Sequence, residues 1–184
     1  MTSMAARPSA EAQPMHPALL ALGALVVLLA LIFLPRLSIG QNRLVGQAAP
    51  DFNLEVVHNG ERGSRLRLGD LQGHPVLLDF WATWCGPCKM EAPLLSRVAA
   101  RYRDRGLIVI GVNTSDQPGL AGAFAAREAL AYPIVFDDQS VANERYGVDV
   151  LPTLVLVGKD GKVRAVRAGL VDESALDAMV AAEL

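Results

Sequence analysis

The sequence predicts one α/β domain, a mixed β-sheet with helices on both of its faces. Short apolar runs, of which residues 76–81 and 107–112 are the clearest, are typical of buried strands. Between these runs, apolar residues recur at helical spacing. Near the C-terminus, two strand patterns flank a tight turn and precede a last helix. Strands that alternate with helices and end in a hairpin make a mixed sheet that helices cover on both faces.

Length and composition favour one core and exclude some functions. The chain has 184 residues, of which 52% are hydrophobic and 20% are charged. That is enough for one domain of about 140 residues and an N-terminal appendage. The formal net charge is −2, and no basic cluster alternates with aromatic residues. We therefore expect no nucleic-acid partner.

The first 48 residues are predicted to lie outside the domain. Residues 1–17 are rich in Ala, Pro and Ser, which is typical of a disordered tail. The next residues are apolar on every side and uncharged as far as residue 34, which predicts a transmembrane anchor over residues 18–35. Residues 36–48 are expected to form a linker, so that the domain itself spans residues 49–184.

A cleaved signal sequence is the alternative to this anchor. Ser38 and Gly40 are small and two residues apart, as at a cleavage site. We favour the uncleaved anchor because the apolar run is longer than the usual core of a signal sequence. The flanking charges are nearly balanced, with Arg7 before the run and Arg36 and Arg43 after it. Orientation in the membrane therefore does not follow from the charges.

The domain is expected to consist of seven strands and several helices in a fixed order. The first part contains a strand at 51–57, its hairpin partner at 65–68, a short turn or single helical turn at 68–73 and a central strand at 76–81. The middle part contains a helix from the cysteine motif to 105, a strand at 107–112, a helix from 118 to about 128 and a strand at 134–136. The last part contains a short helix from 138 to 146, strands at 153–157 and 163–166, and a last helix from about 172.

Turn and cap residues justify the boundaries of the first elements. Asn59-Gly60 is a pair that favours the turn of a β-hairpin. Gly73 and Pro75 bound the central strand on its upstream side. The helix after that strand is expected to end just before Gly106. Its apolar face is formed by residues at helical spacing, Met90, Leu94, Leu95, Val98 and Tyr102.

The later elements have similar signals. Ser115 and Asp116 are candidate N-caps for the helix that Pro118 opens. Gly147 is expected to end the short helix. The Lys-Asp-Gly turn at residues 159–161 joins the last two strands as an antiparallel hairpin.

Both cysteines of the chain lie in Trp84-Cys85-Gly86-Pro87-Cys88, where the central strand gives way to a helix. Pro87 fits an early helical position because the first N–H groups of a helix have no internal partner. The same unpaired amides carry partial positive charge and stabilise a thiolate, so Cys85 is the expected nucleophile toward another disulfide. Cys88 lies one turn later on the same face and is the expected resolving thiol.

Other roles for the two cysteines remain possible. Gly86 and Pro87 leave little bulk beside the sulfurs, which suits close approach of a partner chain. The pair could instead be a structural disulfide, half of a zinc site or two unrelated buried thiols. Zinc is disfavoured because a site of this spacing needs a second ligand pair, and none exists. A copper site is also disfavoured, since His16, His58 and His74 all precede the motif.

Residues 78–88, Leu-Asp-Phe-Trp-Ala-Thr-Trp-Cys-Gly-Pro-Cys, resemble the active-site segment of thioredoxins. The continuation at residues 89–93, Lys-Met-Glu-Ala-Pro, is similar to the membrane-anchored TlpA/ResA branch. Other blocks match that branch in order: Ala49-Pro50-Asp51-Phe52, Leu68-Gly69-Asp70-Leu71-Gln72-Gly73, Tyr146-Gly147-Val148, Leu151-Pro152-Thr153 and Lys159-Asp160-Gly161. The resemblance runs roughly from residue 45 to the C-terminus, and separated blocks are more specific than a lone CxxC motif.

The resemblance implies a thioredoxin-like fold with an added strand–helix–strand unit at residues 111–137. It also implies a redox-active disulfide between Cys85 and Cys88 and a thiol–disulfide oxidoreductase that reduces protein disulfides. The catalytic domain would lie on the periplasmic, extracytoplasmic side of the cell inner membrane. The implied clients belong to cytochrome c maturation or copper-centre assembly, with electrons from a membrane dithiol donor. No cofactor and no metal are expected.

Asp79 lies in the central strand, six residues before Cys85. A carboxylate there is costly to bury, so its pKa should rise and the group could carry a proton as a general acid or base. The position also matches the buried aspartate of thioredoxins. The alternative is a tolerated acid that is linked to water and has no catalytic role.

Glu91 lies three residues after Cys88, on a neighbouring helix face. Its charge could disfavour a nearby thiolate and so contribute to catalysis. A solvated surface residue is an equally good interpretation.

The remaining candidates concern binding of a partner. Trp84 is expected at the surface, where it could contact a client, whereas Trp81 is expected to pack inside. In similar proteins the bond corresponding to Leu151–Pro152 is cis and lies beside the cysteines, and the backbone of Leu151 would pair with a substrate strand. This role for Leu151 and Pro152 is implied by the resemblance, because sequence alone seldom predicts a cis bond.

Two alternative functions fit parts of the sequence. Ala-Pro-Asp-Phe at residues 49–52 also occurs in peroxiredoxin-like peroxidases, but their Pro-x-x-x-Thr-x-x-Cys motif is absent around both cysteines. A copper-binding or assembly module without redox turnover would use the two thiols only as ligands. The sequence does not identify the client, the net direction of exchange, the reduction potential or the oligomeric state.

Overall fold

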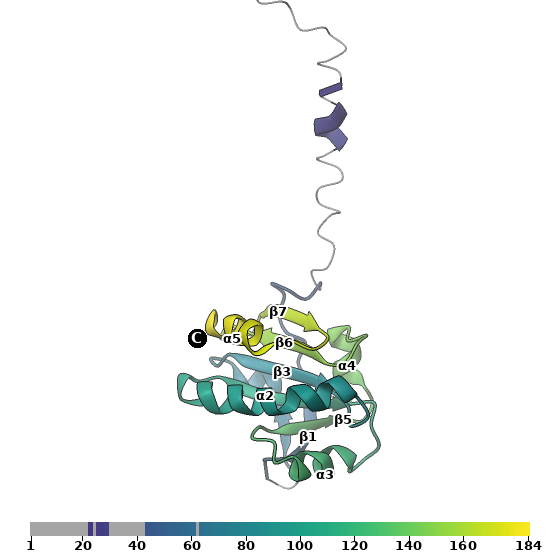
Figure 1. Ribbon diagram of the computed structural model, residues 1–184, viewed down its shortest axis with the longest axis vertical. Coiled ribbons are helices and arrows are strands. Elements are labelled where there is room, and N and C mark those ends of the chain that lie inside the picture. Colours follow the sequence, from purple (N-terminus) through teal and green to yellow (C-terminus); the bar gives the residue numbers. More distant parts are fainter. Residues whose placement is uncertain (1–21, 24, 30–42, 62) are drawn as a thin grey trace, which may run out of the picture. The chain divides into compact units, whose positions relative to one another are not determined.

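The computed structural model describes residues 22, 23, 25–29, 43–61 and 63–184 (Figure 1). Contacts divide the chain into two compact units, Met1–Gln41 and Asn42–Leu184. The predicted tail at 1–17 and most of the predicted anchor at 18–35 lie outside the described residues. Residues 22, 23 and 25–29 are helical. In the part of the chain that the structure describes, no helix is both long enough and apolar enough to cross a bilayer.

The second unit contains one mixed sheet with the strand order β2-β1-β5-β4-β3-β6-β7. The central strand β3 pairs parallel with β4 and antiparallel with β6. The strands are β1 Asn53–His58, β2 Arg65–Arg67, β3 Val76–Trp81, β4 Ile108–Thr114, β5 Ile134–Asp137, β6 Thr153–Val157 and β7 Val163–Ala168. The helices are α2 Gly86–Tyr102, α3 Leu120–Arg127, α4 Val141–Tyr146 and α5 Glu173–Ala181, with 3-10 turns η2 Leu68–Leu71 and η3 Arg103–Arg105.

Alternation along β3 separates two hydrophobic cores. Successive side chains of a strand point to opposite faces of the sheet, and every residue of β3 is buried. Leu77 and Trp81 lie in the core that α2, α3 and α5 cover, and α2 crosses the face of the sheet in Figure 1. Leu78 and Phe80 lie in the opposite core, with residues of α4 and η2. The predicted mixed sheet with helices on both faces is confirmed.

Part of the expected linker belongs to the domain. The Gly46 N–H donates to the Val163 carbonyl at 2.8 Å, and the Val163 N–H donates to the Gln47 carbonyl at 2.9 Å. Ala48 also forms an isolated antiparallel bridge with Lys162. Gly46, Gln47 and Ala48 therefore pair with the backbone at the start of β7, because the edge of a sheet offers backbone groups that need partners.

The start of α3 differs from the prediction for a physical reason. Ser115 and Asp116 were expected to cap this helix, but it begins at Leu120 after Gly119. The Asp116 carboxylate is instead occupied by donors from the loop before Cys85. The short helix α4 also starts late, at Val141.

Candidate active site

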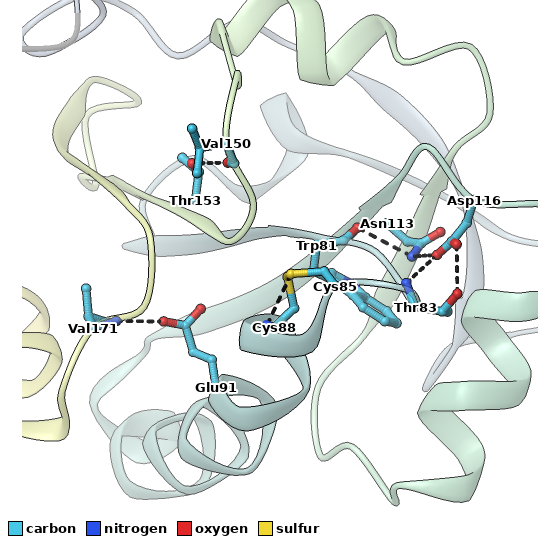
Figure 2. Close-up of a disulfide and its surroundings, with 10 residues drawn as sticks. All are labelled: Trp81, Thr83, Cys85, Cys88, Glu91, Asn113, Asp116, Val150, Thr153 and Val171. Atoms are coloured by element: carbon cyan, nitrogen blue, oxygen red, sulfur yellow. Dashed lines mark hydrogen bonds between the residues drawn. A yellow bond between two sulfur atoms is a disulfide. The ribbon is translucent and has the colours of Figure 1, made fainter.

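The disulfide lies where β3 passes into α2 (Figure 2). Cys85 is the N-cap of α2, with extended backbone angles of φ −77° and ψ 106°. Its Sγ accepts a hydrogen bond from the Cys88 N–H at 3.2 Å. The two sulfurs are bonded to each other, and the Cα atoms are 5.3 Å apart. The structure thus brings the two predicted thiols together at a helix N-terminus.

Access to the disulfide is limited to one side. Cys85 and Cys88 are only 5% and 4% exposed, whereas Trp84 is 63% exposed and Gly86 and Pro87 are also exposed. Trp84, Gly86 and Pro87 are thus the exposed residues that adjoin the two cysteines in the motif. Their role in the approach of a partner stays a prediction.

The loop before β6 contributes to the same hydrophobic core as the disulfide. The Leu151–Pro152 peptide bond is cis. Leu151 packs against the core cluster that contains both cysteines, and Pro152 is buried. The Thr153 hydroxyl donates to the Val150 carbonyl at 2.7 Å, which fixes the turn (Figure 2).

Asp79 is buried behind the disulfide, in the middle of β3. It pairs with Gly111 of β4 on one side and with Leu154 of β6 on the other. The side chain is 3% exposed, and its Oδ1 has no hydrogen-bond partner. Burial raises the pKa of Asp79 well above its usual value, and the nearby charge of Glu91 raises it further. The raised pKa that the sequence predicts for Asp79 is therefore confirmed.

Glu91 points into the same core from α2. It is 1% exposed, so the interpretation of Glu91 as a solvated surface residue is wrong. Its Oε1 accepts the Val171 N–H at 3.2 Å, and its Oε2 has no partner (Figure 2). Burial raises the pKa of Glu91 to about 7, although the Val171 N–H favours the charged form. Glu91 can therefore exchange a proton near neutral pH.

Tyr132 was not singled out from the sequence, yet it belongs to this buried polar cluster. Burial raises the pKa of Tyr132 well above its usual value, and the charges of Asp79 and Glu91 add to the effect. Gly111 makes the close packing possible, because a Cβ there would lie 2.5 Å from Ile134 Cδ1 and 3.2 Å from Tyr132 Cε2. No local pattern marks Tyr132, since its position depends on the pairing of distant strands.

A second polar group lies in front of the site. Asp116 accepts hydrogen bonds from the Thr83 N–H and the Thr83 hydroxyl, both at 2.7 Å, and from Asn113 Nδ2 at 2.6 Å. The Trp84 indole N–H donates to the Ser115 carbonyl at 3.0 Å. We call these five residues, Thr83, Trp84, Asn113, Ser115 and Asp116, the Asp116 network. Its sequence signal, an acid in the loop after β4, was interpreted as a helix cap.

The two described histidines contact backbone carbonyls that belong to neither the disulfide nor the Asp116 network. His58 Nε2 is 3.0 Å from the Leu130 carbonyl, and His74 Nδ1 is 3.3 Å from the Gly106 carbonyl. His16 lies outside the described residues. Over the described ranges, no group of three or more His, Cys, Asp or Glu side chains could hold a metal ion.

The geometry supports one kind of chemistry. A nucleophilic sulfur at a helix N-terminus has a second sulfur within bonding distance and buried carboxyl groups that can take up or release protons. These are the requirements of thiol–disulfide exchange. The open surface beside Trp84 can admit another polypeptide.

The part of the chain that contains this site is similar to known proteins. A model of the AhpC/TSA family matches residues 45–166. Thiol-disulfide oxidoreductase ResA of Geobacillus thermodenitrificans (strain NG80-2) is 38% identical over 125 residues, which are 68% of this chain and 70% of that protein. A crystal structure described as a thiol:disulfide interchange protein DsbE from Chlorobium tepidum has 33% identity, covers 74% of this chain and 94% of its own, and has a TM-score of 0.68. A secreted disulfide oxidoreductase of Mycobacterium tuberculosis has 28% identity, covers 71% and 95% of the two chains, and has a TM-score of 0.62.

Proposed function

Because the chain belongs to the AhpC/TSA family, with the thioredoxin-like fold and thiol–disulfide exchange activity of its ResA-like relatives, we propose that it reduces protein disulfides outside the cytoplasm. The observation that carries this proposal is the Cys85–Cys88 disulfide at the N-terminus of α2, backed by two buried carboxyl groups. The nucleophile is Cys85, and Cys88 resolves the intermediate.

The reaction starts from the reduced pair. The Cys85 thiolate attacks one sulfur of a client disulfide, so that a Cys85–client S–S bond forms while the client S–S bond breaks. The released client sulfur leaves as a thiolate and takes up a proton from solvent. Cys88 then loses its proton to a buried carboxylate, Asp79 or Glu91.

In the second step, the Cys88 thiolate attacks Cys85 Sγ. The Cys85–Cys88 bond forms, and the client leaves with its second sulfur reduced. Two electrons have passed from the cysteine pair to the client. A membrane dithiol donor must then return two electrons to the pair before the next cycle.

The buried carboxyl groups favour the direction of reduction. A strongly oxidising pair is one whose reduced form is stabilised, commonly as a thiolate. Negative charge on Asp79 or Glu91 opposes a thiolate nearby and withholds that stabilisation. The reduction potential should therefore lie toward the reducing end of the family.

The proposed location rests on the apolar run at residues 18–34 and on the resemblance to the TlpA/ResA branch. The description of one solved relative as secreted is in keeping with it. The proposed clients, proteins of cytochrome c maturation or copper-centre assembly, rest on the same resemblance. Pro152 and the backbone of Leu151 are proposed to pair with the client strand.

The reduction potential of the Cys85–Cys88 pair tests the direction. The full chain would be equilibrated in glutathione or dithiothreitol buffers and the fraction of reduced protein measured. We expect a value near the reducing end of the family, about −270 mV, rather than near its oxidising end, about −120 mV. A value close to the oxidising end would contradict the proposed reductase.

A further inference from the structure

Resting on the proposal that the clients are proteins, we propose that Asp116 is a positioning residue that holds the Trp84 indole in place as a docking surface for the client chain. Asp116 touches neither sulfur in any hydrogen bond of the described residues. It acts through Thr83, the residue before Trp84 and two before the nucleophile. Its effect should therefore be on client binding more than on the exchange step.

Asp116 fixes Thr83 through two hydrogen bonds. One carboxylate oxygen accepts the Thr83 backbone N–H and the other accepts the Thr83 hydroxyl, each at 2.7 Å. Hydrogen bonds to a charged acceptor are stronger than those between neutral groups. The backbone N–H and the hydroxyl of Thr83 are thus both held by one side chain from a different loop.

Asp116 is itself held in place by a buried side chain. Asn113 has no exposed surface, and its Nδ2 donates to Asp116 Oδ2 at 2.6 Å. The same nitrogen is 3.5 Å from the Trp81 carbonyl, at the end of β3. The network is therefore anchored in the ends of two neighbouring strands, which are rigid parts of the fold.

The Trp84 side chain is held by the residue next to Asp116. Trp84 is 63% exposed, yet its indole N–H donates to the Ser115 carbonyl. Ser115 adopts a φ of 59°, a left-handed conformation that is uncommon for a residue other than glycine. One turn, Ser115-Asp116, thus holds both the backbone before Trp84 and the end of the Trp84 side chain. Figure 2 shows the first of these contacts, between Asp116 and Thr83.

The consequence follows from the entropy of binding. A side chain that is already ordered loses less freedom when a partner docks on it, so an exposed aromatic group in a fixed orientation adds affinity. Trp84 adjoins Cys85, and a client disulfide must approach Cys85 across it. Release of Trp84 should weaken client binding before it changes the chemistry of the sulfurs.

The test compares Asp116→Ala with Asp116→Asn in the full chain. The amide of Asn can accept the Thr83 N–H with its oxygen and donate to the Thr83 hydroxyl with its nitrogen, so it keeps the geometry but loses the charge. Asp51→Ala is the matched control. Asp51 also accepts a backbone N–H, from Gly69 at 2.9 Å, together with a side-chain donor, but it lies beside η2 before β3.

The probes are oxidised apocytochrome c as a protein disulfide and glutathione disulfide as a small one. For Asp116→Ala, we expect KM for the protein to rise about five- to tenfold while kcat changes less than about twofold. The ratio of kcat/KM for protein over small disulfide should fall by a similar factor. Asp116→Asn should restore this ratio, and Asp51→Ala should keep it.

A spectroscopic measurement follows Trp84 directly. The chain has two tryptophans, so two indole N–H signals are expected by NMR. The Trp84 signal should lose its protection from solvent exchange in Asp116→Ala and keep it in Asp116→Asn. If Asp116→Ala is too unstable for kinetics, Thr83→Val removes one of the two bonds and should shift KM in the same direction.

The outcomes separate this inference from the proposed function. If the wild-type chain does not accelerate reduction of the protein disulfide, the proposed function fails. If the wild-type chain does so and Asp116→Ala keeps the wild-type KM, the positioning role of Asp116 fails alone. An Asp116→Asn variant that keeps the Trp84 N–H protected but shares the raised KM of Asp116→Ala would also overturn it, since the charge of Asp116 and not the position of Trp84 would then set client binding.

Discussion

At the level of single residues, the proposed site contains two buried carboxyl groups. Asp79 and Glu91 each keep one buried oxygen without a hydrogen-bond partner. Such atoms are costly when charged, which is why the pKa of each carboxyl is raised. The cost to the fold and the capacity to carry a proton therefore have the same origin.

Glu91→Gln should stabilise the oxidised protein at pH 8. A carboxyl whose pKa is about 7 in the fold and 4.5 when unfolded binds more protons in the folded state between these values. Stability is then lost as pH rises from about 4.5 to 7, by up to about 3 kcal/mol at higher pH. Urea unfolding of the wild-type chain and Glu91→Gln at pH 4 and pH 8 checks this. A difference between the two proteins that is the same at both pH values would contradict the raised pKa.

Asp79→Asn should slow the step in which Cys88 attacks Cys85, because the amide cannot take the proton from Cys88. The expected loss in the exchange rate is about 10²-fold, with a flatter pH dependence. Stopped-flow reduction of a disulfide client between pH 6 and 9 measures both. The exposed Asp104, replaced by Asn, is the control. Unchanged rates in Asp79→Asn would leave Asp79 with a structural role only.

The residues that could be predicted are those whose environment is set locally. Cys85, Cys88 and the exposed Trp84 follow from a strand-to-helix junction, and the burial of Asp79 follows from its apolar neighbours. The burial of Glu91 depends on Val171, which is 80 positions away in the sequence, and the role of Asp116 depends on Thr83, 33 positions away. Contacts of this kind leave no local periodicity to detect.

At the scale of elements, α5 matters because the loop that leads into it supplies the Val171 N–H to Glu91. Leu176 and Val180 bury the inner face of α5 in the core that contains the cysteines. On the surface, Glu173 forms ion pairs with Arg97 and Arg101 of α2. These ion pairs are partly exposed, so burial should contribute most of the stability.

Leu176→Ala and Arg101→Ala should therefore differ in effect. Removing a side chain that is almost fully buried should cost about 2–5 kcal/mol of unfolding free energy, because a cavity remains. Loss of the exposed Arg101 ion pairs should cost much less unfolding free energy, because solvent screens exposed charges. Chemical unfolding at pH 7 and at two salt concentrations measures both. A larger loss for Arg101→Ala would show that the surface pairs hold α5 in place.

The elements were predicted well where apolar patterns are strong and poorly where caps decide. The bounds of β3 and β6 agree with the predicted ranges, and β4 extends two residues further. The predicted start of α3 was wrong because the candidate cap Asp116 binds Thr83 instead. A polar residue after a strand can satisfy either a helix or a neighbouring loop, and its own sequence does not distinguish them.

At the scale of the whole molecule, one sheet supports the site from behind. The disulfide follows the carboxyl end of the central strand β3, and the loop with Pro152 precedes its antiparallel neighbour β6. Gly46, Gln47 and Ala48 pair with the backbone at the start of β7, at the edge of the sheet. The predicted anchor over residues 18–35 stays a prediction and calls for a test in cells.

A membrane-impermeant thiol reagent tests the proposed location. In intact cells that express the full chain, the reagent should label reduced Cys85 because the domain is proposed to face the extracytoplasmic side. The Cys85→Ser, Cys88→Ser double variant supplies the background signal. Labelling that occurs only after the inner membrane is permeabilised would place the domain in the cytoplasm.

The division of roles between the two sulfurs is the central claim, and covalent trapping tests it most directly. Cys88→Ser and Cys85→Ser chains would be expressed in cells, and mixed disulfides would be separated on non-reducing gels and identified by mass spectrometry. The Cys88→Ser chain should accumulate complexes with client proteins, because Cys85 can attack but nothing resolves the intermediate. The Cys85→Ser chain should trap little, since Cys88 lies inside the first turn of α2, further than the N-cap Cys85 from the unpaired amides at the start of the helix. Complexes with Cys85→Ser and none with Cys88→Ser would reverse the two roles and contradict the account.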